Sequence, residues 1–179
     1  MAAPLMPHSI TTARLLLRPV TLRDAPGYWR TFHHPDVVRM TGSWVYPFSV
    51  EEVRRRFSAA ARSADGHWYM VLEGGEAAGS VKFFNATPDG AELGYSICPS
   101  RTGRGLASEA ARAFCAMGFR QFRYKTIRAG AFADNPASIH ILEKLGFRPI
   151  ADAEPVWSRD RRAFAMLMPF AMTREDYRP

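Results

Sequence analysis

The stretch Ala91–Ala110, which reads AELGYSICPSRTGRGLASEA, decides the fold of this chain. Its first half alternates, with apolar side chains at Leu93, Tyr95 and Ile97, and this period of two predicts a strand. Proline cannot donate a hydrogen bond to a sheet, so we expect the strand to end near Pro99.

A glycine-rich turn follows this strand and leads into a helix. Gly103 and Gly105 allow the backbone to approach a ligand closely, and apolar residues recur at helical spacing from Leu106 onward. Such a turn presents free N–H groups and the positive end of a helix dipole, a combination that binds phosphate. Arg104 and Arg101 would add positive charge. Many turns are glycine-rich for conformational reasons alone, so this segment leaves both an anion site and a purely structural turn open.

A second helix start lies downstream in Asn135–Phe147, which reads NPASIHILEKLGF. Asn135 suits the N-cap, Pro136 the first turn, and Gly146 the C-terminal end of this helix. The residues before it, Lys125–Phe132, read KTIRAGAF and predict a strand. The chain thus gives a strand, a phosphate-type turn, a helix, a strand and an asparagine-capped helix.

These segments together resemble the GNAT superfamily of N-acetyltransferases, and in particular its RimJ/RimL-like branch. The family's pyrophosphate loop, Q/R-x-x-G-x-G/A, corresponds to Thr102–Ala107 and departs from the pattern at Thr102. The segment that begins at Asn135 is similar to the branch pattern N-x-x-S-x-x-x-L-E-K-x-G-F. Three N-terminal segments are similar to the branch's opening strand and first helices: Leu15–Asp24, His34–Thr41 and Tyr46–Glu52. The resemblance implies one GNAT acetyltransferase domain over residues 1–179, with a core of about 12–168.

The implied fold is α/β (α+β), with a mixed, mostly antiparallel central sheet flanked by helices and strands that splay at the acetyl-CoA site. Local patterns give the elements outside the motifs. Helices are expected after the capping-box-like starts at Thr21 and Ser49. Strands are expected at residues 13–20, 67–73 and 77–85, with a closing pair at 148–153 and 163–168 that is joined by a loop carrying Trp157.

The resemblance also implies acetyl-CoA as the co-substrate and assigns residues to its binding. Backbone N–H groups near Ile97 and Cys98 would face the thioester oxygen, and Asn135 would contact the pantetheine arm. The expected co-substrate contacts are Ile97, Cys98, Thr102, Gly103, Arg104, Gly105, Leu106, Ala107, Ser108, Asn135 and Ser138.

The chemistry that this family performs is the attack of an amine on a thioester. Glu92 on the motif strand is the leading candidate for the base, acting through a water if need be, although an exposed strand carboxylate explains it equally. The position of the family's usual acid, a tyrosine, holds Leu142 here. Ser138 lies one turn earlier and is the candidate acid; its alternative role is a first-turn hydroxyl. Cys98 has no neighbour in sequence that would activate it as a nucleophile.

The resemblance also implies an acceptor site near the end of the first helix. His33 and His34 lie there, although a surface role fits them as well. The aromatic residues Trp44, Tyr46 and Phe48 could shape the acceptor pocket or simply pack in the core.

The composition is that of an ordinary globular chain. It has 179 residues, of which 47% are hydrophobic and 23% charged, enough for one domain with a substantial core. No apolar run is long enough to cross a membrane, and the N-terminal residues lack the pattern of a secretory signal. Cys98 and Cys115 show neither a disulfide framework nor metal-ligand spacing. We therefore expect a cytoplasmic protein with no metal site and no membrane partner.

The net charge of +7 permits nucleic-acid binding without requiring it, because the arginines are scattered rather than gathered in a stripe with aromatic residues. The sequence favours an N-acetyltransferase that moves acetyl from acetyl-CoA to a primary amine, such as a protein N-terminal α-amine. Acetylation of a small amine metabolite or drug, and a catalytically weak CoA-binding sensor, are the alternatives. A homodimer also stays open.

Overall fold

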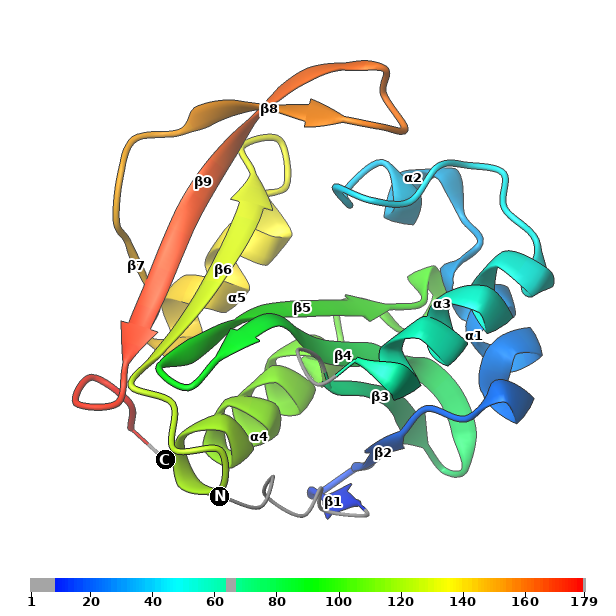
Figure 1. The fold of residues 1–179 in the computed structure, drawn as a ribbon, viewed down its shortest axis with the longest axis horizontal. Helices are drawn as coiled ribbons and strands as arrows, with labels where there is room; N and C mark the ends of the chain where they lie inside the picture. Colours follow the sequence, from blue (N-terminus) through cyan, green and yellow to red (C-terminus); the bar gives the residue numbers. More distant parts are fainter. Residues whose placement is uncertain (1–8, 64–66, 179) are drawn as a thin grey trace.

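A central sheet of nine strands organises the chain in the computed structural model, which describes residues 9–63 and 67–178 (Figure 1). The sheet order is β1-β2-β3-β4-β5-β6-β9-β7, and β8 pairs with β9. Every pairing is antiparallel except that of β5 with β6, so the expected mixed, mostly antiparallel sheet is confirmed. The strands are β1 (Ile10–Thr11), β2 (Leu15–Pro19), β3 (His67–Glu73), β4 (Glu76–Thr87), β5 (Gly90–Ile97), β6 (Thr126–Phe132), β7 (Arg148–Pro149), β8 (Glu154–Ser158) and β9 (Ala163–Thr173).

Helices cover both faces of the sheet and create two cores. The helices are α1 (Ala25–Phe32), α2 (Pro35–Val38), α3 (Val50–Arg62), α4 (Leu106–Arg120) and α5 (Pro136–Leu145). On one face, α1 and α3 pack their buried side chains, including Tyr28 and Phe57, against Met70 of β3. On the other face, Phe114 of α4 and Leu142 of α5 belong to the larger core. Successive residues of the central strands therefore face different cores.

The pairing between β5 and β6 is short, and this opens the sheet. It covers only Gly90 to Glu92 of β5, where Glu92 lies beside Arg128. Beyond that point β5 continues along β4 as far as Ile97, whereas β6 continues along β9 as far as Phe132. Figure 1 shows β6 and β9 rising away from β5. The strands thus splay next to the residues that the sequence singled out.

Local signals set the ends of the helices as expected. The Ser49 hydroxyl accepts a hydrogen bond from the Glu52 amide at 3.2 Å and caps α3. The Asn135 side chain accepts one from the Ser138 amide at 3.1 Å and caps α5. Gly146 ends α5 with φ of +96°, a conformation that glycine adopts without strain.

The C-terminal strands differ from the prediction. Only residues 148–149 of the expected strand at 148–153 pair with the sheet, as β7, and the expected loop contains β8 with Trp157 in it. The last strand is also longer than expected and reaches Thr173. Long-range pairing explains the difference: β9 offers hydrogen-bonding groups to β6, β7 and β8, whereas the local pattern around Pro155 gives no strand signal.

We predict that removal of the α3 cap destabilises the fold measurably. Ser49→Ala should lower the free energy of unfolding by about 1 kcal/mol, because the Glu52 amide loses its acceptor. Ser49→Asp keeps an acceptor at the same place and should retain the stability of the wild type. Urea unfolding of the three proteins checks this, and equal midpoints for wild type and Ser49→Ala would show that the cap contributes nothing.

Candidate active site

A cavity of about 600 Å³ lies where β5 and β6 separate. Its lining comes from both faces of the sheet. Lys82 and Glu92 reach it from the α1/α3 face, since they share that face with Trp68 in the strand register. Tyr95 and Ser138 reach it from the α4/α5 face. The splay therefore connects two sides of the sheet that continuous strands would keep apart.

The cavity extends to the glycine-rich loop, since Thr102 and Ala107 line it as well. Gly103 and Gly105 have φ of +74° and +76°, which explains why glycines stand there. Gly105 offers no side chain to cap α4, and the first helical hydrogen bond comes from the Glu109 amide. The backbone amides that precede Glu109 in the first turn of α4 therefore have no acceptor within the helix and face out of its N-terminus, where a pyrophosphate would bind. These amides belong to Leu106, Ala107 and Ser108.

The arginines beside this loop are held by carboxylates. Arg104 pairs with Glu73 at 2.6 Å, and Arg101 pairs with both Glu73 and Glu76. Both partners come from the ends of β3 and β4. The guanidinium groups are therefore part of an ionic cluster, and an incoming phosphate would compete with Glu73 for Arg104.

Arg14, which lies between β1 and β2, contacts the glycine-rich loop and was missed by the sequence analysis. Its guanidinium donates to the backbone carbonyl of Arg104 at 2.8 Å and pairs with Glu109 of α4 at 2.6 Å. It also lies 3.6 Å from the position that a Cβ on Gly105 would occupy. Arg14 thus brings a third positive charge to the loop. Its partners lie 90 or more residues away, so no local pattern could reveal it.

Ser138 has a partner that the sequence analysis also missed. The hydroxyl of Tyr95 lies 2.9 Å from the Ser138 hydroxyl. Burial raises the pKa of Tyr95 to about 12, and the hydrogen bond with Ser138 opposes that rise. The phenol therefore stays protonated at neutral pH. Leu142 lines the cavity with a buried aliphatic side chain, so a tyrosine reaches this region from β5 rather than from α5.

Glu92 is partly exposed in the cavity and points to the α1/α3 side. Its carboxylate accepts a hydrogen bond from the Asn85 side chain at 2.8 Å. A carboxylate at this edge of the gap can accept a proton from an amine that enters from the α1/α3 side.

The backbone amides of Ile97 and Cys98, both expected to face the thioester oxygen, point to opposite sides of the strand. The Cys98 amide donates to the carbonyl of Ala78 at 2.9 Å, so it is already engaged with β4 and does not fit that role. Successive residues of a strand direct their N–H groups to opposite sides, so the Ile97 amide faces the gap. Of the two residues, only Ile97 offers a donor on the correct side.

The residues expected at the acceptor site are only partly brought together. Trp44 lines the cavity and is buried, whereas His33 and His34 lie outside its lining. The His33 ring instead packs against Trp29, with ring centroids 4.4 Å apart, and against Tyr46 and Phe48. The His33 ring therefore packs within the segment around α2 rather than lining the gap, and His34 is exposed.

Lys82 is a cavity residue that the sequence analysis did not single out. Its ammonium group lies 4.9 Å from the ring centroids of both Trp68 and Phe84. Burial lowers its pKa to about 8; repulsion from Arg56 acts in the same direction, and attraction to Glu92 opposes it. A lysine inside the sheet has no sequence signature, because its partners come from other strands.

Among residues 9–63 and 67–178, no group of three or more His, Cys, Asp or Glu side chains is placed to hold a metal ion. Within the same residues, no helix is both long and apolar enough to span a membrane.

Comparison with known proteins agrees with this geometry. The family model described as "Acetyltransferase (GNAT) domain" matches residues 14–148. The uncharacterized N-acetyltransferase YoaA of Bacillus subtilis (strain 168) is 30% identical over 146 residues, which cover 78% of this chain and 82% of that protein.

Two solved structures show the same fold. The ribosomal L7/L12 alpha-N-protein acetyltransferase RimL, in complex with coenzyme A, has a TM-score of 0.84 and 18% identity over 92% of this chain and 97% of its own. The spermidine N-acetyltransferase of Vibrio cholerae, in complex with CoA and spermine, has a TM-score of 0.82 and 16% sequence identity. The match covers 93% of this chain and 99% of that chain.

The chain is thus a GNAT acyltransferase: it belongs to the acetyltransferase family of the RimJ/RimL type. Acetyl-CoA is the co-substrate that this membership implies, and the acceptor is an amine.

We predict that Lys82 destabilises the protein at neutral pH. Its folded pKa of about 8 lies below the ordinary value of 10.5, so folding penalises the protonated form. The penalty is complete below pH 8 and disappears as the pH rises from 8 to 10.5. Lys82→Met should therefore raise the free energy of unfolding at pH 7 by up to about 3 kcal/mol, and by little at pH 10.5.

Urea unfolding at pH 7, 9 and 10.5 tests this prediction. The matched control is Lys144→Met, because Lys144 is exposed and its replacement should change stability by less than about 0.5 kcal/mol. A variant at position 82 that is no more stable than wild type at pH 7 would contradict the expectation.

Proposed function

We propose that this enzyme transfers the acetyl group of acetyl-CoA to a primary amine that enters from the α1/α3 face, and we favour a protein N-terminal α-amine. The observation that carries the proposal is one continuous cavity, which joins the loop at the start of α4 to Ser138 and Glu92 through the gap between β5 and β6. Acetyl-CoA then lies on the α4/α5 side and the acceptor on the other, so that the two reactants meet in the gap.

In the proposed mechanism Glu92 takes a proton from the acceptor amine, directly or through a water. The amine nitrogen attacks the thioester carbon, and the N–C bond forms while negative charge develops on the carbonyl oxygen. The Ile97 amide donates to that oxygen. The C–S bond then breaks as the carbonyl re-forms, and the Ser138 hydroxyl, supported by the protonated Tyr95, donates a proton to the thiolate. The second proton of the nitrogen leaves through water and restores the Ser138 hydroxyl. The products are the acetylated amine and free coenzyme A.

The choice of acceptor rests on the charges of the cavity. The solved relatives include an enzyme named for a protein N-terminus and another named for spermidine. A polyamine is a polycation and would meet Lys82 in the cavity, whereas a terminal α-amine carries one charge that is lost near pH 8. A small amine metabolite with a single amino group stays as the second candidate. We also propose that one domain performs this reaction in the cytoplasm.

We predict that Gly105 is needed for the binding of coenzyme A. Gly105→Glu should weaken binding more than about 100-fold, because it places bulk and negative charge where the pyrophosphate lies. Gly105→Ala tests the backbone separately, since φ of +76° costs an alanine about 1 kcal/mol of stability but adds no charge. Titration calorimetry with coenzyme A checks both variants. A folded Gly105→Glu variant that binds like wild type would remove the loop from the site.

We predict that Glu92→Gln lowers turnover about 10²–10⁴-fold and leaves coenzyme A affinity unchanged, as for a base that acts only in the chemical step. The loss should shrink as the pH approaches the pKa of the acceptor amine, where more of the amine is already neutral. A pH–rate series with a peptide acceptor checks this. Wild-type turnover of Glu92→Gln at pH 6–7 would show that Glu92 is not the base.

A further inference from the structure

Lys82 is a cation with no carboxylate in direct contact among the described residues, although Glu92 lies near enough to attract it. Its Nζ contacts the rings of Trp68 and Phe84, and within residues 9–63 and 67–178 it forms neither an ion pair nor a hydrogen bond. A desolvated ammonium group costs free energy unless it is paired. Protein interiors retain such a group mainly where it has a function.

The backbone around Lys82 is shaped to hold its side chain in the cavity. Gly94 lies directly opposite on β5, and a Cβ there would come within 3.3 Å of the Lys82 Cε atom and of the Phe84 ring. Glycine at this position therefore leaves the room in which the lysine side chain runs over the strand. Trp68 occupies the corresponding place on β3, and its indole N–H is buried without a hydrogen-bond partner among the described residues.

Lys82 and Glu92 form a pair of opposite charges on one face of the sheet. Lys82 is paired with Gly94, and Glu92 lies two residues before Gly94 on the same strand. Such diagonal neighbours lie about 7–8 Å apart, within the reach of long side chains. Within residues 9–63 and 67–178 the two side chains form no ion pair, although Glu92 attracts the Lys82 ammonium group, so together they can hold the two ends of one small group. If the acceptor amine lies at Glu92, a group of the acceptor that contacts Lys82 is only a few atoms away from that amine.

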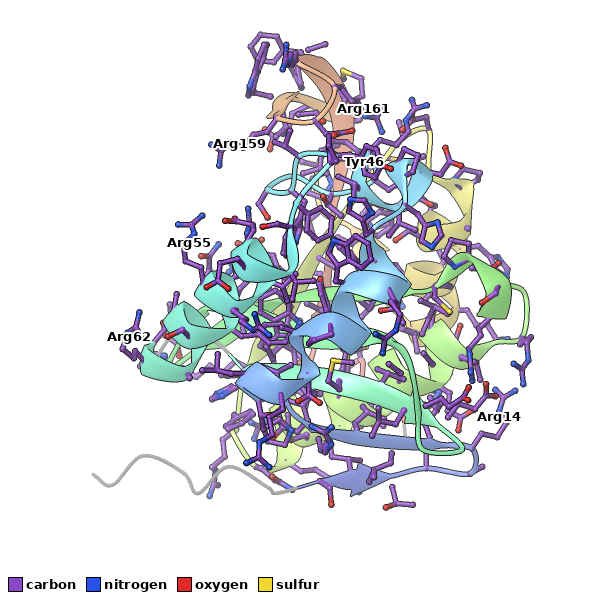
Figure 2. All side chains as sticks on the ribbon, turned by 90° about the vertical axis from the view of Figure 1, so that its right-hand side faces the viewer. Arg14, Tyr46, Arg55, Arg62, Arg159 and Arg161 are labelled. Carbon is purple, nitrogen blue, oxygen red and sulfur yellow. The ribbon has the colours of Figure 1, made fainter. Side chains whose placement is uncertain are left out.

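Further cations lie around a second hollow next to the cavity. It has a volume of about 340 Å³, shares Trp44 with the cavity, and is lined by Arg55, Arg56 and Arg159. Its acidic residue, Glu52, is already paired with the first two of these arginines. Figure 2 shows Arg55 and Arg159 projecting from the same side of the molecule.

Besides Glu92, one further acidic residue of the cavity opposes this pattern. Asp36 lines the cavity, but it is exposed on α2 rather than placed beside Lys82.

We propose that Lys82 binds a carboxylate of the acceptor, so that the preferred acceptor is a primary amine with a carboxylate a few atoms away. This inference rests on the proposed acetylation of an amine at Glu92. Two sources carry such a group: a protein whose first residue is acidic, and a free amino acid.

Two amidated peptides that differ only in the first residue, Asp or Asn, test the proposal. At pH 7 the wild type should acetylate the Asp peptide with a kcat/KM about 10- to 100-fold higher, the usual effect of a hydrogen bond to a charged group. Lys82→Met should bring the ratio close to 1. Lys82→Arg should keep most of it, because arginine retains the charge and the donors.

The arginine variant also separates the proposal from a role of Lys82 as the base. Arginine does not give up its proton in a protein, so Lys82→Arg would lose turnover on both peptides alike if Lys82 were the base. That outcome, or an unchanged peptide ratio in Lys82→Met, overturns the carboxylate site. Free aspartate as a third acceptor distinguishes the two sources, since a higher kcat/KM for it than for the Asp peptide identifies an amino acid.

A second measurement keeps the proposal separate from the proposed function. Binding of the two N-acetylated product peptides to the coenzyme A-loaded protein needs no turnover. If the wild type binds the acidic product more tightly and Lys82→Met removes the difference, the carboxylate site is supported, even if neither peptide is acetylated. A lack of acetylation of both peptides would count only against the proposal of an N-terminal acceptor. Equal binding of both products to the wild type overturns the site.

Discussion

The early end of the pairing between β5 and β6 is the constraint on which the rest of the structure depends. Three residues of β5 pair with β6, and the following five do not. Backbone groups of Tyr95 and Ile97 that a neighbouring strand would have occupied instead face a cavity. Because unpaired N–H and C=O groups in a protein interior are costly, such a gap persists where a substrate or water supplies the missing partners. The co-substrate of an acetyltransferase has the length and polarity to do so.

The two sides of this gap have different chemistry because each belongs to a different core. On the α4/α5 side lie a helix N-terminus, a glycine loop and the hydroxyl pair of Tyr95 and Ser138, polar groups that suit the proposed binding of an anionic thioester. On the α1/α3 side, aromatic rings surround the charges of Lys82 and Glu92. The division follows from the alternation of side chains along β5, which directs Tyr95 to one side of the gap and Glu92 to the other.

The ionic groups of the site work against stability in one place and support it in another. Arg14, Arg101 and Arg104 are neutralised by Glu73, Glu76 and Glu109, so the loop can fold before any phosphate is bound. Lys82 has no such ion-pair partner in the part of the chain that the structure describes, and its lowered pKa reflects the free energy that its burial costs. Binding sites commonly retain a destabilising group of this kind, because the ligand supplies the interaction that the folded protein lacks.

The sequence by itself determined what neighbouring residues encode: the caps at Ser49 and Asn135, the glycines of the loop, and the periods of the helices and strands. The class of enzyme came from the resemblance of two of these segments to the motifs of the GNAT family. These signals act within a turn or two of the chain, so one stretch of sequence contains them entirely. Only the tertiary structure decided which groups meet across the gap. The pairing of Tyr95 with Ser138, the support of the loop by Arg14, the exclusion of His33 and the placement of Lys82 beside Glu92 all depend on strand register and helix packing. Contacts between residues far apart in the chain are fixed by the packing of the whole domain, and no local pattern records them.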